Sequence, residues 1–141
     1  KLLKNRTIQI FIKLKIKNLM RLINMKKSGS DKKKECQFQL EGKDIQQIIP
    51  NMGYCFATKK ITMEGMKIGY MYREVPDDHS DSGWRFFSGT ENQDYVDDPS
   101  NIQIYDVNTI VNYDKAIIPY LHSPIGSEYE RVEEFDNFQL L

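Results

Sequence analysis

The sequence feature that most restricts the fold is the segment Trp84–Ser88, which lies between Gly83 and Gly89. Its large side chains alternate, with Trp84 and Phe86 on one side and Arg85 and Phe87 on the other, and this period of two predicts a β-strand. Trp84 and Phe86 are expected to anchor the core because each buries a large apolar area. Gly83 and Gly89 are expected to adopt backbone geometry that other residues resist. We therefore predict structural roles for Gly83, Trp84, Phe86 and Gly89.

This strand lies in a longer segment, Tyr72–Glu91, that concentrates the unusual residues of the chain. The segment contains the only tryptophan, one of two histidines (His79), five carboxylates and two arginines. Pro76-Asp77-Asp78 predicts a turn ahead of the strand. Such a concentration of residues is compatible with metal binding, catalysis, framework packing or recognition of a partner.

The formal net charge of zero hides two oppositely charged parts. Residues 1–34 contain twelve Lys or Arg and one Asp, a net charge of +11, whereas residues 35–141 contain eight basic and nineteen acidic residues, a net charge of −11. No apolar run in the sequence is long enough to span a bilayer. We expect residues 1–34 to form a basic extension and linker, and residues 35–141 to form a single domain with its own core.

The basic segment 1–34 has more than one interpretation. Its apolar residues fit either a strand or a helical face, so periodicity leaves its structure open. A basic amphipathic segment suits an anionic membrane surface or nucleic acid, whereas a disordered or non-native extension explains the same composition without a function; we favour the extension. Lysines at positions 13, 15 and 17 interrupt any signal-peptide apolar region. Cys36 and Cys55 are too few for a disulfide framework or a structural zinc site, which favours free thiols.

Residues 35–141 alternate short apolar segments with turn residues. Gly65 suits a hairpin turn between the first two predicted strands, and Asp106 and Asp114 suit helix N-caps. We predict strands at Tyr54–Thr58, Met66–Tyr72, Trp84–Ser88 and Ile102–Tyr105, a last hairpin of Ser127–Arg131 and Phe135–Leu140, a helix at Lys43–Ile49, a helical turn at Glu91–Val96, and helical segments after Asp106 and after Asp114. The expected fold is α+β, with a mainly antiparallel sheet built from hairpins and two or three short helices.

A metal site and an active site are both disfavoured. Asp77, Asp78, His79 and Asp81 are oxygen and nitrogen donors within five positions, but they lack the glycine and the distant glutamate of an EF-hand loop. Acidic turns are usually solvated, so we predict no metal site. The chain has no G-x-S-x-G elbow, no H-E-x-x-H and no glycine-rich phosphate loop, and His122 lies far from His79 in sequence. We expect no catalytic residues and no enzymatic activity.

Recognition of a basic protein explains the accumulation of acids better. Complementary charge speeds encounter, and aromatic residues such as Tyr72, Tyr95 and Tyr105 could anchor a partner. The candidate partner-binding residues are Glu74, Asp77, Asp78, Asp81, Glu91, Asp94, Asp97 and Asp98. Composition alone fits equally well an acidity that only confers solubility. A small ligand- or metal-binding module is the alternative function.

Several motifs together resemble one protein family. R-E-V-P-D at Arg73–Asp77 and D-S-G-W-R-F-F-S-G-T-E at Asp81–Glu91 resemble a family of small bacterial immunity proteins from polymorphic toxin systems. The resemblance continues with Tyr95, D-P-S-N-I at Asp98–Ile102, I-Y-D-V-N-T-I at Ile104–Ile110, N-Y-D at Asn112–Asp114, I-I-P-Y-L at Ile117–Leu121 and S-P-I-G-S at Ser123–Ser127. It covers roughly 53–131, and Lys115 replaces the proline that typically follows N-Y-D.

This resemblance implies a role rather than a mechanism. It implies a cytoplasmic protein that binds and neutralises a cognate protein toxin, with no catalysis and no cofactor. We expect no nucleic-acid partner for the folded domain. The family supplies no toxin-contact residues, so the eight acidic candidates rest on the charge argument alone.

Overall fold

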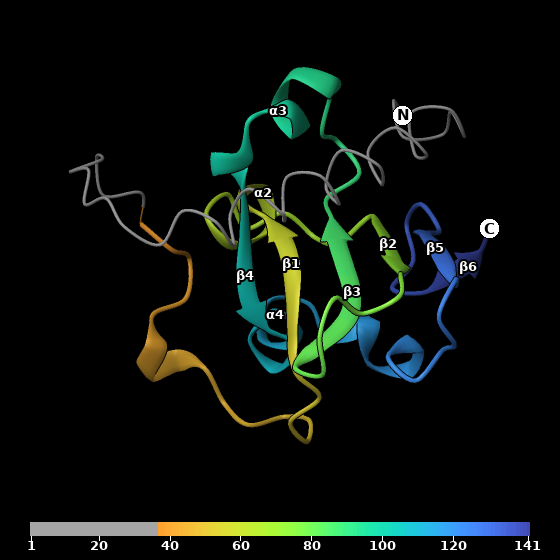
Figure 1. Cartoon of the computed structure of the whole chain (residues 1–141). Helices are drawn as coiled ribbons and strands as arrows, with labels where there is room; N and C mark the ends of the chain where they lie inside the picture. The colour runs from red at the N-terminus through yellow and green to blue at the C-terminus, as the bar shows by residue number, and fades with distance from the viewer. Residues whose placement is uncertain (1–36) are drawn as a thin grey trace.

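The computed structural model describes residues 37–141, which are built around one six-stranded sheet (Figure 1). The predicted extension at 1–34 lies outside the described residues. The strands are β1 (Tyr54–Thr58), β2 (Tyr70–Arg73), β3 (Asp81–Phe87), β4 (Ile102–Asp106), β5 (Glu128–Arg131) and β6 (Phe138–Leu140). The helices are α2 (Lys59–Thr62), α3 (Gln93–Asp97) and α4 (Val107–Tyr113), with short 3-10 segments η2 (Gly42–Asp44), η3 (Pro99–Asn101) and η4 (Lys115–Tyr120). In this part of the chain no helix is long and apolar enough to cross a membrane.

The strand order β4-β1-β3-β2-β5-β6 defines the topology. β1 and β3 run parallel, and the other neighbouring pairs are antiparallel, which confirms the predicted α+β class with a mainly antiparallel sheet. The predicted hairpin between β1 and β2 is wrong, because β3 lies between these strands. The turn at Gly65 instead follows α2, which begins directly after β1 and buries Ile61 in the core. The predicted last hairpin, by contrast, is confirmed by the β5–β6 pair.

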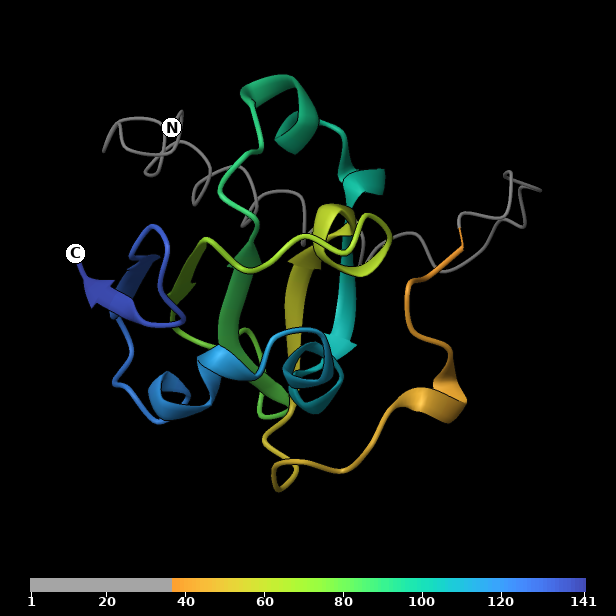
Figure 2. The same cartoon turned by 180° about the vertical axis from the view of Figure 1, so that it is seen from behind.

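One face of the sheet carries the main core. Figure 2 shows α2 and α4 lying across this face. Trp84 and Phe86 point into it from β3, both with no exposed surface, and their rings stack with centroids 5.8 Å apart. The indole N–H of Trp84 donates to the carbonyl of Leu121 at 3.1 Å, so its one polar atom is paired. Truncating a buried aromatic of this kind typically costs about 3–5 kcal/mol.

The opposite face of the sheet is aromatic. Phe56, Tyr70, Tyr72 and Phe87 are all buried, and Phe87 packs within about 6 Å of both tyrosine rings, centroid to centroid. Arg85 shares this face, with its guanidinium 4.6 Å from the centroid of the Phe56 ring. The alternation predicted for Trp84–Ser88 is therefore confirmed, because successive β3 side chains enter different clusters.

Two predicted caps form as expected, whereas one predicted helix is absent. The Asp106 carboxylate accepts from the Asn108 N–H at the start of α4, and the Asp114 carboxylate accepts from the Ala116 N–H at the start of η4. The helix predicted at Lys43–Ile49 is wrong, since only η2 forms there. The backbone N–H groups of Ile48 and Ile49 donate to the side-chain oxygen of Asn108, at 2.8 and 3.1 Å. These bonds to α4 replace the hydrogen bonds that a helix would make.

Candidate functional site

A buried ionic cluster occupies the start of β3. Arg85 donates two hydrogen bonds to the Asp81 carboxylate, at 2.7 and 3.0 Å, and a third to Glu74 at 2.7 Å. The side chains of Arg85 and Asp81 have no exposed surface, and that of Glu74 is 21% exposed. Burial opposes the ionisation of Asp81, but bonds from Arg85 and from backbone N–H groups outweigh it and hold its pKa below the ordinary value. Burial also raises the pKa of Glu74, against the opposing effect of Arg85.

The loop between β2 and β3 is held by its own acidic side chains. Asp78 accepts hydrogen bonds from the N–H of Ser80 and from the hydroxyl of Tyr54, at 2.7 and 2.9 Å. These bonds hold the pKa of Asp78 below its usual range. The N–H of Asp77 donates to Asp81 at 3.0 Å, which ties the loop to the ionic cluster. Asp77 and Asp78 therefore face solvent from a loop of fixed shape.

Arg73 fastens this loop to a second one. Its guanidinium donates to the carbonyl of Ser82 at 3.0 Å and to the carbonyl of Ser123 at 2.7 Å. The backbone N–H of Gly126 donates to the carbonyl of Arg73 at 2.7 Å. Two large apolar residues are exposed on the joined loops: Val75 is 69% exposed and Ile125 is 53% exposed. The acidic loop is thus bordered by exposed apolar surface.

Glu91 stabilises the turn that follows β3. Its carboxylate accepts from the backbone N–H groups of Ser88 and Gly89, at 2.8 and 2.9 Å, and from the hydroxyl of Thr58 at 2.6 Å. Gly89 has a φ of +89°, which favours glycine at this turn. Because Glu91 is 1% exposed, its carboxylate is committed to the fold and is not presented at the surface.

The three remaining acidic candidates are exposed around α3. Asp94 and Asp97 belong to this helix, and Asp98 accepts from the Ser100 N–H at the start of η3. Figure 1 shows α3 at the end of the sheet opposite to the β2–β3 loop. The seven residues of β3 separate the two ends by on the order of 20 Å. The eight candidates thus comprise buried or half-buried Glu74, Asp81 and Glu91, the loop acids Asp77 and Asp78, and the α3 acids Asp94, Asp97 and Asp98.

The aromatic candidates are less exposed than the recognition hypothesis expects. Tyr72 is 1% exposed on the aromatic face, and Tyr95 and Tyr105 are half-buried. The Tyr105 hydroxyl is paired with Thr62 at 2.9 Å, and Lys60 lies over the Tyr95 ring at 5.2 Å from its centroid. These side chains mainly support the scaffold.

The structure does not assemble the histidines into a site. His79 and His122 are both exposed, one on the β2–β3 loop and one on the turn after η4. Within residues 37–141, no group of three or more His, Cys, Asp or Glu side chains is placed to hold a metal ion. Cys55 is a free, buried thiol whose pKa is raised by burial, and Cys36 lies outside the described residues.

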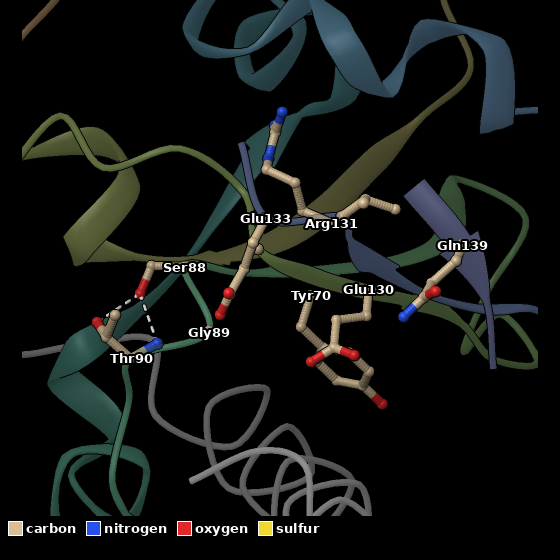
Figure 3. Close-up of a pocket in the computed structure, with 10 residues that line it drawn as sticks. Tyr70, Ser88, Gly89, Thr90, Glu130, Arg131, Glu133 and Gln139 are labelled. Carbon is tan, nitrogen blue, oxygen red and sulfur yellow. Dashed lines mark hydrogen bonds between the residues drawn. The ribbon is translucent and has the colours of Figure 1, made fainter. Parts of the chain in front are cut away.

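A cavity of about 370 Å³ lies at the end of the sheet where β3 leads toward α3 (Figure 3). Its walls include Tyr70 from β2, Ser88 and Thr90 from the turn after β3, Glu130 from β5 and Gln139 from β6. Sequence analysis missed this cavity because its walls come from segments up to 70 positions apart. Only the pairing of β2 with β3 and β5 brings them together.

The fold and the site define a small α+β domain that presents acidic loops from a sheet fixed by buried ion pairs. The family model for the immunity protein Imm33 domain matches residues 55–141, and the chain therefore belongs to the Imm33 immunity protein family. This confirms the family resemblance found in the motifs and extends it through β6. No curated protein and no solved structure matches the chain.

Proposed function

We propose that this protein neutralises a cognate bacterial toxin by binding it, in the cytoplasm and without catalysis or a cofactor. The observation that carries this proposal is membership of the immunity family over residues 55–141, which include β3, α3 and the β5–β6 hairpin. An immunity protein acts on a toxin that would otherwise harm the producing cell or its kin, and stoichiometric binding requires only a complementary surface.

The proposed toxin-binding surface consists of the exposed acids. The loop acids Asp77 and Asp78 and the α3 acids Asp94, Asp97 and Asp98 are all solvent-facing, and residues 35–141 carry a net charge of −11. A basic toxin surface would be steered toward them, because complementary charge raises association rates. Val75 and Ile125 add exposed apolar area beside the loop acids.

The buried candidates contribute to binding by fixing this surface. Asp81 accepts from the backbone N–H of Asp77, and Glu91 holds the turn that leads toward α3. A loop held in one conformation loses less entropy on binding than a mobile one, and this increases affinity. Glu74, Asp81 and Glu91 therefore act through the shape of the loops.

Co-expression with the product of the adjacent gene tests the proposed function. We expect the full-length protein to restore growth of cells that produce this toxin candidate and to co-purify with it in a 1:1 complex. Failure of both rescue and co-purification would refute toxin binding. Thermal-shift measurements with divalent cations and small ligands would then test the alternative function, a ligand- or metal-binding module.

A further inference from the structure

The cavity beside the β3 turn contains acidic groups that the fold does not use. Among residues 37–141, the carboxylates of Glu130 and Glu133 take part in no ion pair and no side-chain hydrogen bond. Both residues line the cavity, and Figure 3 shows the Glu133 side chain pointing toward Gly89. The neighbouring cation, Arg131, is already bound to Asp114 and to Asp136. Two unneutralised carboxylates thus border one concave site.

A buried tyrosine forms part of the wall of the same cavity. Tyr70 lines this cavity and is 2% exposed, so it contributes an aromatic side chain to the wall and almost no polar surface.

The remaining polar wall groups are also hydrogen-bond acceptors. The hydroxyls of Ser88 and Thr90 bond to each other at 2.8 Å; that of Thr90 also accepts from Lys60 at 3.1 Å, whereas that of Ser88 keeps lone-pair capacity. Gln139 adds a side-chain amide opposite them. Carboxylates, hydroxyls and an aromatic ring together suit a cation that donates several hydrogen bonds, and the planar guanidinium with five N–H donors fits this set better than a compact ammonium.

We propose that this cavity receives an arginine side chain from the toxin. The inference rests on the proposed function and adds the chemistry of one contact to it. The cavity and the α3 acids lie at the same end of β3, since Ser88–Thr90 leads into α3 and Lys60 donates to Thr90 while lying over Tyr95. One basic toxin surface can therefore contact both the α3 acids and the cavity.

The first test titrates the ¹⁵N-labelled full-length protein with N-acetyl-arginine methylamide. We expect the amide resonances of Gly69, Ser88, Gly89 and Thr90 to shift and saturate, with a Kd on the order of 1–10 mM for this small probe. The citrulline analogue keeps the shape and loses the charge, and it should bind about tenfold more weakly. Equal binding of both probes, or no shift of these amides with either, would overturn the proposal.

Matched variants distinguish binding of the probe in the cavity from a general effect of the acidic charge of the domain. The double variant Glu130→Gln, Glu133→Gln should weaken the arginine probe about tenfold, whereas Glu134→Gln, which removes the adjacent charge outside the cavity wall, should leave its affinity unchanged. Thermal unfolding of each variant checks that the fold is intact. An equal effect of both changes would mean that the probe senses only overall charge, and the cavity would lose its assignment.

Toxin binding by the same variants distinguishes the two proposals. If the wild-type protein binds the toxin and Glu130→Gln, Glu133→Gln lowers that affinity at least about tenfold, both proposals stand. If toxin affinity is unchanged in this variant, the cavity proposal fails and the proposed function remains. If the arginine probe binds but the toxin neither binds nor is neutralised, the proposed function fails, and the toxin is excluded as the occupant of the cavity.

Discussion

Asp81 and Arg85 lie four positions apart on one strand, yet their side chains form a two-point ion pair at 2.7 and 3.0 Å. A regular strand would separate them by roughly 13 Å. The β1–β3 register explains the contact, because Tyr54 pairs with Asp81 and Phe56 pairs with Arg85. Two steps along β1 thus match four along β3, and Gly83 takes a φ of +80° at this bulge. The bulge shortens the strand and brings the two charges together.

Replacing Arg85 with methionine is expected to destabilise the domain strongly. The change would leave Asp81 buried without its counter-ion, and breaking a buried pair from one side typically costs about 3–5 kcal/mol. Urea denaturation of the variant measures this loss of unfolding free energy. Asp136→Asn is the control, because Asp136 pairs with Arg131 at the surface and should cost less than about 1 kcal/mol. Similar costs for the two variants would contradict the role assigned to the buried pair.

Gly83→Ala tests the bulge itself. A Cβ at this position would lie 2.3 Å from the carbonyl oxygen of Glu74, and the positive φ is unfavourable for alanine. We expect a loss of more than about 2 kcal/mol in unfolding free energy. Gly126→Ala is the matched control, since its φ is +95° but its Cβ would meet no atom within 4 Å. That variant should lose only about 1 kcal/mol, and equal losses would show that backbone strain alone accounts for the effect.

The fall of the unfolding free energy at acid pH should depend on Asp78. Because its pKa is lower in the folded protein, the stabilisation from Asp78 is present above the unfolded value, about 3.9, and is lost as pH falls through the folded value. In Asp78→Asn the unfolding free energy should therefore fall less steeply below pH about 4 than in the wild type. Chemical denaturation over an acid pH series measures both slopes. Parallel curves would show that the bonds from Ser80 and Tyr54 do not favour the ionised carboxylate.

Asn108 is predicted to hold the segment that precedes β1. It is 6% exposed, accepts from the N–H groups of Ile48 and Ile49, and donates to the carbonyl of Gln46. Asn108→Ala should cost about 2–3 kcal/mol by leaving these groups without partners, and it should speed amide exchange at Ile48 and Ile49. Asn112→Ala, at a half-buried site where water can substitute, should cost about 1 kcal/mol or less. Unchanged exchange in Asn108→Ala would contradict this role.

These contacts explain why local sequence patterns predicted some elements and missed others. The alternation around Trp84 and the caps at Asp106 and Asp114 depend on residues near one another in sequence, and all three formed as predicted. The helix expected at Lys43–Ile49 had suitable spacing of isoleucines but lost its backbone donors to Asn108, about 60 positions away. The prediction of a β1–β2 hairpin was wrong for the same reason, since the parallel partner of β1 is β3, which comes later in the chain than β2.

For the acidic candidates, too, the sequence predicted some properties and missed others. The sequence shows how many acidic residues there are. It does not show which of them are exposed to a partner, because each buried acid is paired through tertiary contacts. Asp81 meets Arg85 only through the bulge, and Glu91 meets Thr58 only after β1 has packed beside β3. Composition therefore identified an acidic domain, whereas the sheet determines which carboxylates reach solvent.

The two groups of exposed acids can be separated by their effects on toxin-binding kinetics. Charge steers association from a distance. Two double variants reverse it, Asp77→Lys with Asp78→Lys in the loop and Asp94→Lys with Asp97→Lys in α3. Each should lower the association rate about tenfold at low salt, and less at high salt. The cavity and the α3 acids lie at one end of β3, so we expect only the α3 pair also to raise the dissociation rate. Surface plasmon resonance at two ionic strengths measures both rates.

A third double reversal, Glu41→Lys with Asp44→Lys, controls for net charge. Glu41 is the N-cap of η2 and Asp44 is its last residue, and both are exposed and lie outside both groups. A fall in association rate equal to that of the other pairs would show that total charge, and not the loop acids or the α3 acids, guides the toxin. A faster dissociation confined to the loop pair would instead place the contact beside Val75 and Ile125. Since the two ends lie on the order of 20 Å apart, these outcomes point to different faces of the domain.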